Sequence, residues 1–302
     1  MAGVTAPPSR ASSSLLAWYF VIVWGSGYLA TKVGLQYAPP FTFLSLRFVF
    51  GMLLVVPIAL IVRPTWPGTA AEWFHVAFAG VLMHAINLGG SHYAQYLGMS
   101  AGIAALVLAL QPLVTAMVAA PLLGERLSRR HWMGIALGLL GVALVVWHKI
   151  DLNALSGAAL AAVAIALAAI TAGTLYQRIF CPVVDLRAAS VIQFVASLVV
   201  LVPLAFLIEE FRFTFAWPML AAIAFLVVFA SIFAVNALHT LMRRGEATRV
   251  TSLLYLTPII AVALEWAMFG VQPTPLTAIG IAITCAGVAL VAWRPRGAGS
   301  PR

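Results

Sequence analysis

The chain has 302 residues, of which 63% are hydrophobic and 8% are charged, and its formal net charge is +9. A soluble globular domain carries roughly 25% charged residues, so this composition excludes a soluble enzyme or binding module and indicates a chain buried in a lipid bilayer. The positive charge is dispersed over loops and forms no basic patch interleaved with aromatic residues, which argues against nucleic acid as a partner.

Apolar stretches predict ten transmembrane helices. A helix that crosses about 30 Å of hydrocarbon needs about 20 mainly apolar residues, because every backbone polar group must be satisfied within the helix. Residues 1–14 and 294–302 are small, polar and proline-bearing, and we expect them to form disordered cytoplasmic tails. In chain order the predicted helices cover residues 15–32, 42–62, 73–97, 103–123, 131–148, 155–177, 188–208, 217–241, 249–269 and 276–293.

The chain repeats itself with an offset of 146 residues, so that Gly134 matches Gly280 and Trp147 matches Trp293. The predicted repeats cover residues 15–148 and 155–293 with five helices each. Five is an odd number, so the second repeat enters the membrane inverted relative to the first. Most of the 17 basic residues fall on the side of the N-terminus, which places both chain ends in the cytoplasm. Inverted repeats are typical of alternating-access carriers, which bind substrate near mid-membrane between the repeats.

Short motifs along the chain resemble those of a known transporter family. The resemblance, to the EamA-type members of the drug/metabolite transporter superfamily, implies a ten-helix exporter of amino acids or other small metabolites in the cell inner membrane, like the aromatic amino acid exporters of the YddG type. The family often repeats its Gly-Glu pair, here Gly124-Glu125, after the ninth helix, where this chain has Gly270-Val271, so no role is carried over to that position. The motifs are Trp24-Gly25-Ser26, Lys32, Pro39-Pro40, Arg47, Gln111-Pro112, Leu123–Ser128, Gly173–Arg178 and Tyr255–Pro258.

Polar and aromatic side chains inside the predicted helices are the candidate substrate-binding residues, because polar groups are costly in hydrocarbon and hydrogen bonding between helices is their alternative role. The third helix is the richest, with polar residues at three- and four-residue spacing on one stripe from His84 to Gln95. A second, weaker stripe holds His92 and Tyr96. The predicted substrate-binding set is Trp24, Tyr28, His84, Asn87, Ser91, Gln111, Asn236 and Tyr255.

Lys32, Arg47 and Glu265 are charged residues inside or at the end of predicted helices, and Glu265 is the only acidic residue within a span. An isolated charge there costs about 2.5 kcal/mol or more. We predict that Glu265 pairs with Arg47 or Lys32 and forms part of an external gate or coupling site. Separate snorkelling of all three to the headgroups is the alternative.

Other functions are also open at this point. No phosphate-cradling glycine loop is present, which argues against ATP-driven pumping and leaves proton antiport or facilitated diffusion. Nucleosides and cationic compounds are alternative substrates. A distant alternative is an intramembrane serine hydrolase with Ser26 as nucleophile and His84 as base. We expect no enzymatic activity, no cofactor and no metal site, and a chain that works as a monomer with a small-molecule substrate and the bilayer as its partners.

Overall fold

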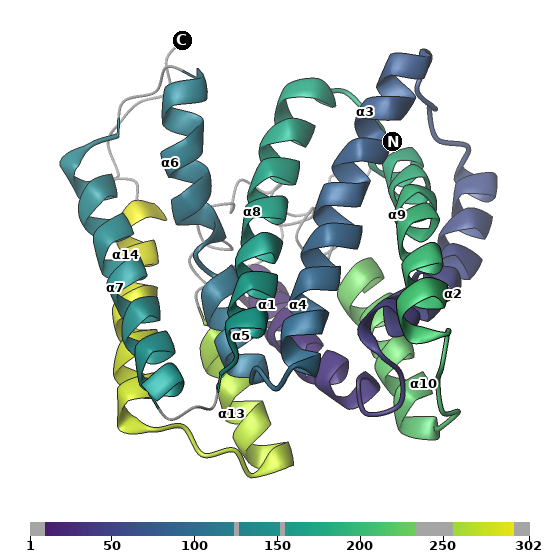
Figure 1. Ribbon diagram of the computed structural model, residues 1–302. Coiled ribbons are helices and arrows are strands. Elements are labelled where there is room, and N and C mark those ends of the chain that lie inside the picture. The colour runs from purple at the N-terminus through teal and green to yellow at the C-terminus, as the bar shows by residue number, and fades with distance from the viewer. Residues whose placement is uncertain (1–9, 124–126, 152–154, 234–255, 293–302) are drawn as a thin grey trace.

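The computed structural model describes residues 10–123, 127–151, 155–233 and 256–292, which form helices joined by short loops (Figure 1). Within these ranges a helix lies at each of the ten predicted positions, and there is no β-strand. Among the described residues, five segments are long and apolar enough to cross a membrane by length and composition alone, namely Pro40–Val62, Ala101–Ala119, Arg129–Trp147, Gly157–Phe180 and Leu186–Glu209. The elements are α1 (Arg10–Gly34), α2 (Pro40–Val62), α3 (Ala70–Gly80), η1 (Val81–Ile86), α4 (Asn87–Tyr96), α5 (Ala101–Leu108), α6 (Gln111–Leu123), α7 (Arg129–Asp151), α8 (Gly157–Phe180), α9 (Leu186–Glu209), α10 (Trp217–Ala224), η2 (Phe225–Phe233), α13 (Thr257–Phe269) and α14 (Pro275–Ala292).

The first helix begins earlier than its apolar run predicts. α1 starts at Arg10, so residues 10–14 of the predicted tail are helical. Alanine is the best helix former and serine is well tolerated in a first turn, so the helix extends beyond the apolar run. The rest of the predicted tails, with Asn236 and Tyr255, lies outside the described residues.

The third helix of each half contains a π-helical segment. α3, η1 and α4 run on from one another, and the backbone at both junctions is helical. In the second half, α10 continues into η2 in the same way. Adding the offset of 146 to residues 81–86 gives residues 227–232, which lie inside η2. π turns are rare and concentrate at functional positions. Their recurrence at equivalent places therefore indicates a functional role for these two helices.

The fourth helix is interrupted at its proline. α5 ends at Leu108 and α6 begins at Gln111, next to Pro112. Proline lacks the N–H that would bond to the carbonyl of Leu108 and its ring crowds that carbonyl, which accounts for the break in the helix at this position.

Glycine allows α7 and α14, which occupy equivalent positions in the two halves, to pack with their backbones in contact. A Cβ added to Gly134 would lie 2.5 Å from the carbonyl oxygen of Gly287, and one added to Gly141 would lie 2.5 Å from that of Gly280. The residue numbers rise along one helix as they fall along the other, so the two helices are antiparallel. Small residues at such positions replace side-chain packing by close backbone contact.

Two contacts join a residue to its own equivalent in the other half. Phe48 and Phe194, 146 residues apart, have ring centroids 4.9 Å apart where α2 crosses α9. On the opposite side of the molecule, Thr284 Oγ1 lies 3.4 Å from the carbonyl oxygen of Gly138 where α14 crosses α7 (Figure 1). On each of these two sides, a residue of one half therefore contacts the equivalent residue of the other half.

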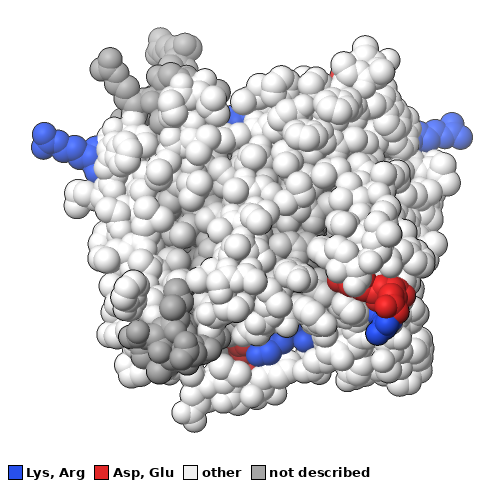
Figure 2. Space-filling view, viewed as in Figure 1, with Lys and Arg blue, Asp and Glu red and all other residues white. Residues whose placement is uncertain are grey.

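Charge is sparse on the surface of the bundle. On the face in Figure 2, the Lys, Arg, Asp and Glu side chains lie toward the upper and lower edges, with an uncharged band between them. That is the distribution expected where hydrocarbon surrounds the middle of a protein and headgroups surround its ends.

Candidate functional site

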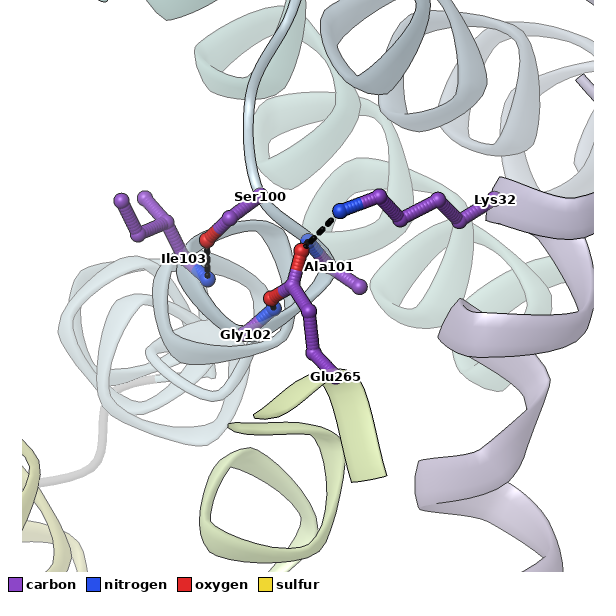
Figure 3. A network of polar contacts seen from close by, with 6 residues as sticks. All are labelled: Lys32, Ser100, Ala101, Gly102, Ile103 and Glu265. Carbon is purple, nitrogen blue, oxygen red and sulfur yellow. Dashed lines mark hydrogen bonds and ion pairs between the residues drawn. The ribbon is translucent and has the colours of Figure 1, made fainter. Parts of the chain in front are cut away.

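Glu265 lies at the centre of a polar network with Lys32 and the first residues of α5 (Figure 3). Its residue is 2% exposed, and its Oε1 accepts a hydrogen bond from Lys32 Nζ at 2.5 Å. The same carboxylate accepts from the backbone N–H groups of Ala101 and Gly102, each at 3.1 Å. The ion pair predicted for Glu265 is thus confirmed, with Lys32 as the partner.

The carboxylate lies at the N-terminus of α5, where backbone N–H groups have no partner within the helix. Ser100 caps one of them by accepting from Ile103 N at 3.2 Å, and Glu265 takes the two before it. A negative charge is favoured there because the helix dipole places partial positive charge at that end. The network joins α1 and α5 of the first half to α13 of the second.

Arg47 lies on α2, which is not one of the three helices that this network joins. It lines a cavity of about 50 Å³ between α2, α9 and η2, on the side of α2 that carries Phe48. Its guanidinium carbon is 6.0 Å from the centroid of the Phe48 ring. The remaining residues that line the cavity are Gly51, Val55, Ser190, Phe194 and Val227.

His84 is hydrogen-bonded to one of a pair of linked glutamine side chains, which were not among the predicted binding residues. Its Nε2 donates to Gln193 Oε1 at 3.2 Å, and Gln193 Nε2 donates to Gln177 Oε1 at 3.2 Å. The His84 ring also meets Phe48 and Phe194 edge-on, with centroids 5.8 and 5.5 Å away. The repeat offered a way to find Gln193, because 193 minus 146 is 47, the position of Arg47.

Two further contacts tie α8 to the first half. His75 Nδ1 is hydrogen-bonded to the hydroxyl of Tyr176 at 2.6 Å. Gln111 Nε2, at the start of α6, donates to Thr174 Oγ1 at 3.1 Å. Gln111 therefore bonds between helices in this structure.

The other polar residues predicted on the third helix are buried in the bundle. Asn87 is 7% and Ser91 4% exposed, and Asn87 Nδ2 donates to the Met83 carbonyl of its own helix at 3.1 Å. His84 lies within η1 and Asn87 directly follows it, so the turn that joins them is wider than the predicted α-helical spacing. His92, on the second stripe, is hydrogen-bonded through Nε2 to Thr31 Oγ1 at 2.8 Å.

The candidates on α1 have unlike surroundings. Trp24 is 40% exposed and packs against Phe20, whereas Tyr28 is partly buried against the main apolar core. Ser26 Oγ donates to the carbonyl of Ile22 in its own helix at 2.7 Å. In the hydrolase alternative Ser26 and His84 would face each other, and here each has another partner.

A second buried carboxylate, Glu209, was missed. It accepts from Phe41 N at 3.0 Å and from Thr42 N and Oγ1 at 2.7 and 2.8 Å, and so caps the N-terminus of α2. The predicted helix stopped at residue 208, which is why Glu265 was counted as the only acidic residue in a span. One indication was available, because α2 begins with Pro39-Pro40 and has no capping side chain of its own.

The comparisons with known proteins cover nearly the whole chain. A model of the EamA-like transporter family matches residues 11–147 and again residues 155–293. The uncharacterized inner membrane transporter YedA of Escherichia coli K12 is 30% identical over 290 residues, which cover 92% of this chain and 89% of that protein. A probable amino-acid metabolite efflux pump of the same organism is 28% identical over 294 residues, or 91% of this chain and 92% of that protein.

A more distant protein and a solved structure extend the likeness. The uncharacterized transporter YvbV of Bacillus subtilis is 26% identical over 297 residues, covering 93% of this chain and 92% of that protein. A solved structure titled only "Crystal structure of protein" is 21% identical, covers 94% of this chain and 98% of its own, and superposes with a TM-score of 0.63. At that identity the last comparison concerns the fold alone.

Proposed function

This chain belongs to the EamA-like transporter family and is a membrane transporter, and we propose that it exports small metabolites, amino acids first among them, by alternating access. The choice of amino acids follows the relative that is called a probable amino-acid metabolite efflux pump. The relative called an inner membrane transporter supports a place in the cell inner membrane. Aromatic amino acids are the narrower candidate.

The proposal includes two inverted five-helix repeats with both chain ends in the cytoplasm. A two-fold rotation that exchanges the repeats leaves in place only points on its axis, so equivalent residues that touch must lie beside that axis. The Phe48–Phe194 and Gly138–Thr284 contacts give two such points at opposite sides of the bundle. The antiparallel packing of α7 on α14 agrees with an axis in the membrane plane, the symmetry of alternating-access carriers.

The network around Glu265 is the observation that carries the transport mechanism. By the proposed topology, Lys32, Ala101 and Glu265 all lie at the outer end of the membrane. The carboxylate of Glu265 belongs to the second repeat. It binds α1 of the first repeat through the ion pair with Lys32, and it binds α5 of the first repeat at that helix's N-terminus. We therefore assign it as an external gate that is closed in this structure. Its opening would separate the repeats on that side.

The proposed substrate site lies between the repeats. The candidate binding residues are His84 with its partner Gln193, Gln111 and the aromatic residues Trp24 and Tyr28. Aromatic rings suit the apolar body of a metabolite, and amide and imidazole groups suit its polar end. Asn87, Ser91, Asn236 and Tyr255 remain predictions.

Counterflow in proteoliposomes tests this function. Purified protein is reconstituted with an unlabelled amino acid inside, and uptake of the same labelled compound is followed for a panel of amino acids, nucleosides and cationic drugs. We expect uptake of amino acids above that of liposomes that contain the doubly substituted Lys32→Ala, Glu265→Ala protein. Uptake of nucleosides or cations alone would refute the amino-acid assignment, and no uptake of any compound would refute the carrier proposal.

A further inference from the structure

We propose that Arg47 binds the carboxylate of the substrate in the cavity between α2 and α9, so that this carrier selects metabolites with a carboxylate next to an apolar body. The inference rests on the proposed function and narrows it to one substrate class. It also gives Arg47 a role apart from the gate, where the sequence had placed it together with Lys32 and Glu265.

The cavity combines one cation with an apolar wall. Arg47 and the Ser190 hydroxyl supply its polar side chains, and the rings of Phe48 and Phe194 with the methyl groups of Val55 and Val227 supply the rest. Ser190 Oγ donates its proton to the Leu186 carbonyl at 2.8 Å, so its oxygen is left as an acceptor. A cationic donor and a hydroxyl acceptor match the carboxylate and the ammonium group of an amino acid, and the apolar walls suit the carbon atoms next to them.

The depth of Arg47 in the membrane supports binding over gating. Phe48 touches its own equivalent, Phe194, so both rings lie beside the proposed two-fold axis and hence near the middle of the bilayer. Arg47 precedes Phe48 in the chain and lines the same cavity. An arginine at mid-membrane is costly, and such charges face a protein or water-filled interior where they mark the path of a substrate.

The two repeats differ at this position in a way that gives one carboxylate site instead of two. The equivalent of Arg47 is Gln193, a neutral amide that donates to Gln177 and accepts from His84. Arginine also has the better geometry, because its planar fork can donate two parallel hydrogen bonds to a carboxylate.

The size of the cavity limits what it holds. A volume of about 50 Å³ has room for a few water-sized groups, since one water takes roughly 10–15 Å³ by this measure. The carboxylate and the adjoining carbon fit such a space, and the remainder of a bound amino acid extends beyond it.

Analogues that lack one functional group test the assignment. Proteoliposomes loaded with phenylalanine take up labelled phenylalanine in the presence of 3-phenylpropanoate, which has the carboxylate without the amine, or phenethylamine, which has the amine without the carboxylate. For wild type we expect competition by 3-phenylpropanoate. In Arg47→Gln its half-inhibitory concentration should rise on the order of tenfold or more, because a charge-assisted hydrogen bond is lost. Arg63→Gln, which removes an exposed arginine at the C-terminal cap of the same helix, is the matched control and should behave as wild type.

The outcomes separate this inference from the broader function. If phenylalanine is transported and 3-phenylpropanoate inhibits Arg47→Gln as strongly as wild type, the carboxylate site is overturned while the carrier stands. If wild type takes up no phenylalanine above empty liposomes, the carboxylate site is overturned. The carrier proposal is then tested by the counterflow panel of amino acids, nucleosides and cationic drugs described above. Should Arg47→Gln not elute as a monodisperse protein, Arg47→Lys decides, because it keeps the charge and loses the fork. A weakened response to 3-phenylpropanoate supports the site, and an unchanged response overturns it.

Discussion

Replacing Glu265 by alanine should lower thermal stability far more than replacing its partner Lys32. The Glu265 side chain is 3% exposed and accepts three hydrogen bonds, so its loss leaves an ammonium group and two backbone N–H groups without their acceptor. Each buried donor left without an acceptor costs about 1–3 kcal/mol, so we expect about 3–5 kcal/mol for Glu265→Ala. In Lys32→Ala the carboxylate keeps both backbone donors, and the lysine side chain is 26% exposed, so we expect about 1 kcal/mol.

These free energies convert to different melting midpoints. For a chain of this size 1 kcal/mol corresponds to roughly 2–4 °C in the melting midpoint. The midpoint should therefore fall by roughly 6–20 °C in Glu265→Ala and by roughly 2–4 °C in Lys32→Ala. The measurement is the temperature at which half of the detergent-solubilised protein is lost from the monodisperse peak in size-exclusion chromatography. Glu210→Ala is the control, because Glu210 is an exposed carboxylate paired with Arg212, and its midpoint should not change.

Two results would contradict this reasoning. Equal losses in Lys32→Ala and Glu265→Ala would mean that the ion pair alone matters and that the carboxylate does not hold the N-terminus of α5. A midpoint for Glu265→Ala within 2 °C of the Glu210→Ala control would mean that the network does not join the three helices. A charge swap of Lys32 and Glu265 should not restore stability, since it places an ammonium group at the positive end of a helix.

Two further substitutions probe the packing between the repeats, with the same midpoint as the measurement. Gly141→Ala should lower the midpoint by several degrees, because the added methyl would lie 2.5 Å from the Gly280 carbonyl oxygen and overpacking costs about 1–3 kcal/mol. The control is Gly157→Ala, whose added methyl would meet no neighbouring residue within 4 Å and should leave the midpoint unchanged. Equal effects of the two substitutions would refute the contact. Glu209→Ala should cost about 1–2 kcal/mol as a lost cap of α2, and a midpoint equal to that of Glu210→Ala would show that the cap is unimportant.

The positions of the helices could be predicted because hydrocarbon thickness fixes how many consecutive apolar residues a span needs. The irregular parts could not be predicted in the same way. A proline announces the break between α5 and α6, but nothing in the composition of residues 81–86 separates η1 from an α-helix. A π turn depends on which carbonyl each N–H reaches, and packing against neighbouring helices decides that.

The ion pair of Lys32 and Glu265 could be predicted because few charges lie in the spans and each needs a partner. Its role as a cap could not, since the sequence does not say which helix N-terminus lies beside Glu265. Glu209 was lost to a boundary one residue too short. Gln193 could be found only by comparing equivalent positions in the two repeats, where it corresponds to Arg47.

The same comparison shows that the two ends of the proposed carrier cannot close alike. The equivalents of Lys32 and Glu265 are Arg178 and Ala119, and alanine has no carboxylate. Under the proposed topology, the inner end therefore closes through contacts other than an ion pair at these two positions. Under the proposed topology, opening the outer end would break the contacts of Glu265 with Lys32 and with the N-terminus of α5. That cost favours a closed outer end at rest, the state in which the proposed carrier would admit a cytoplasmic substrate before export.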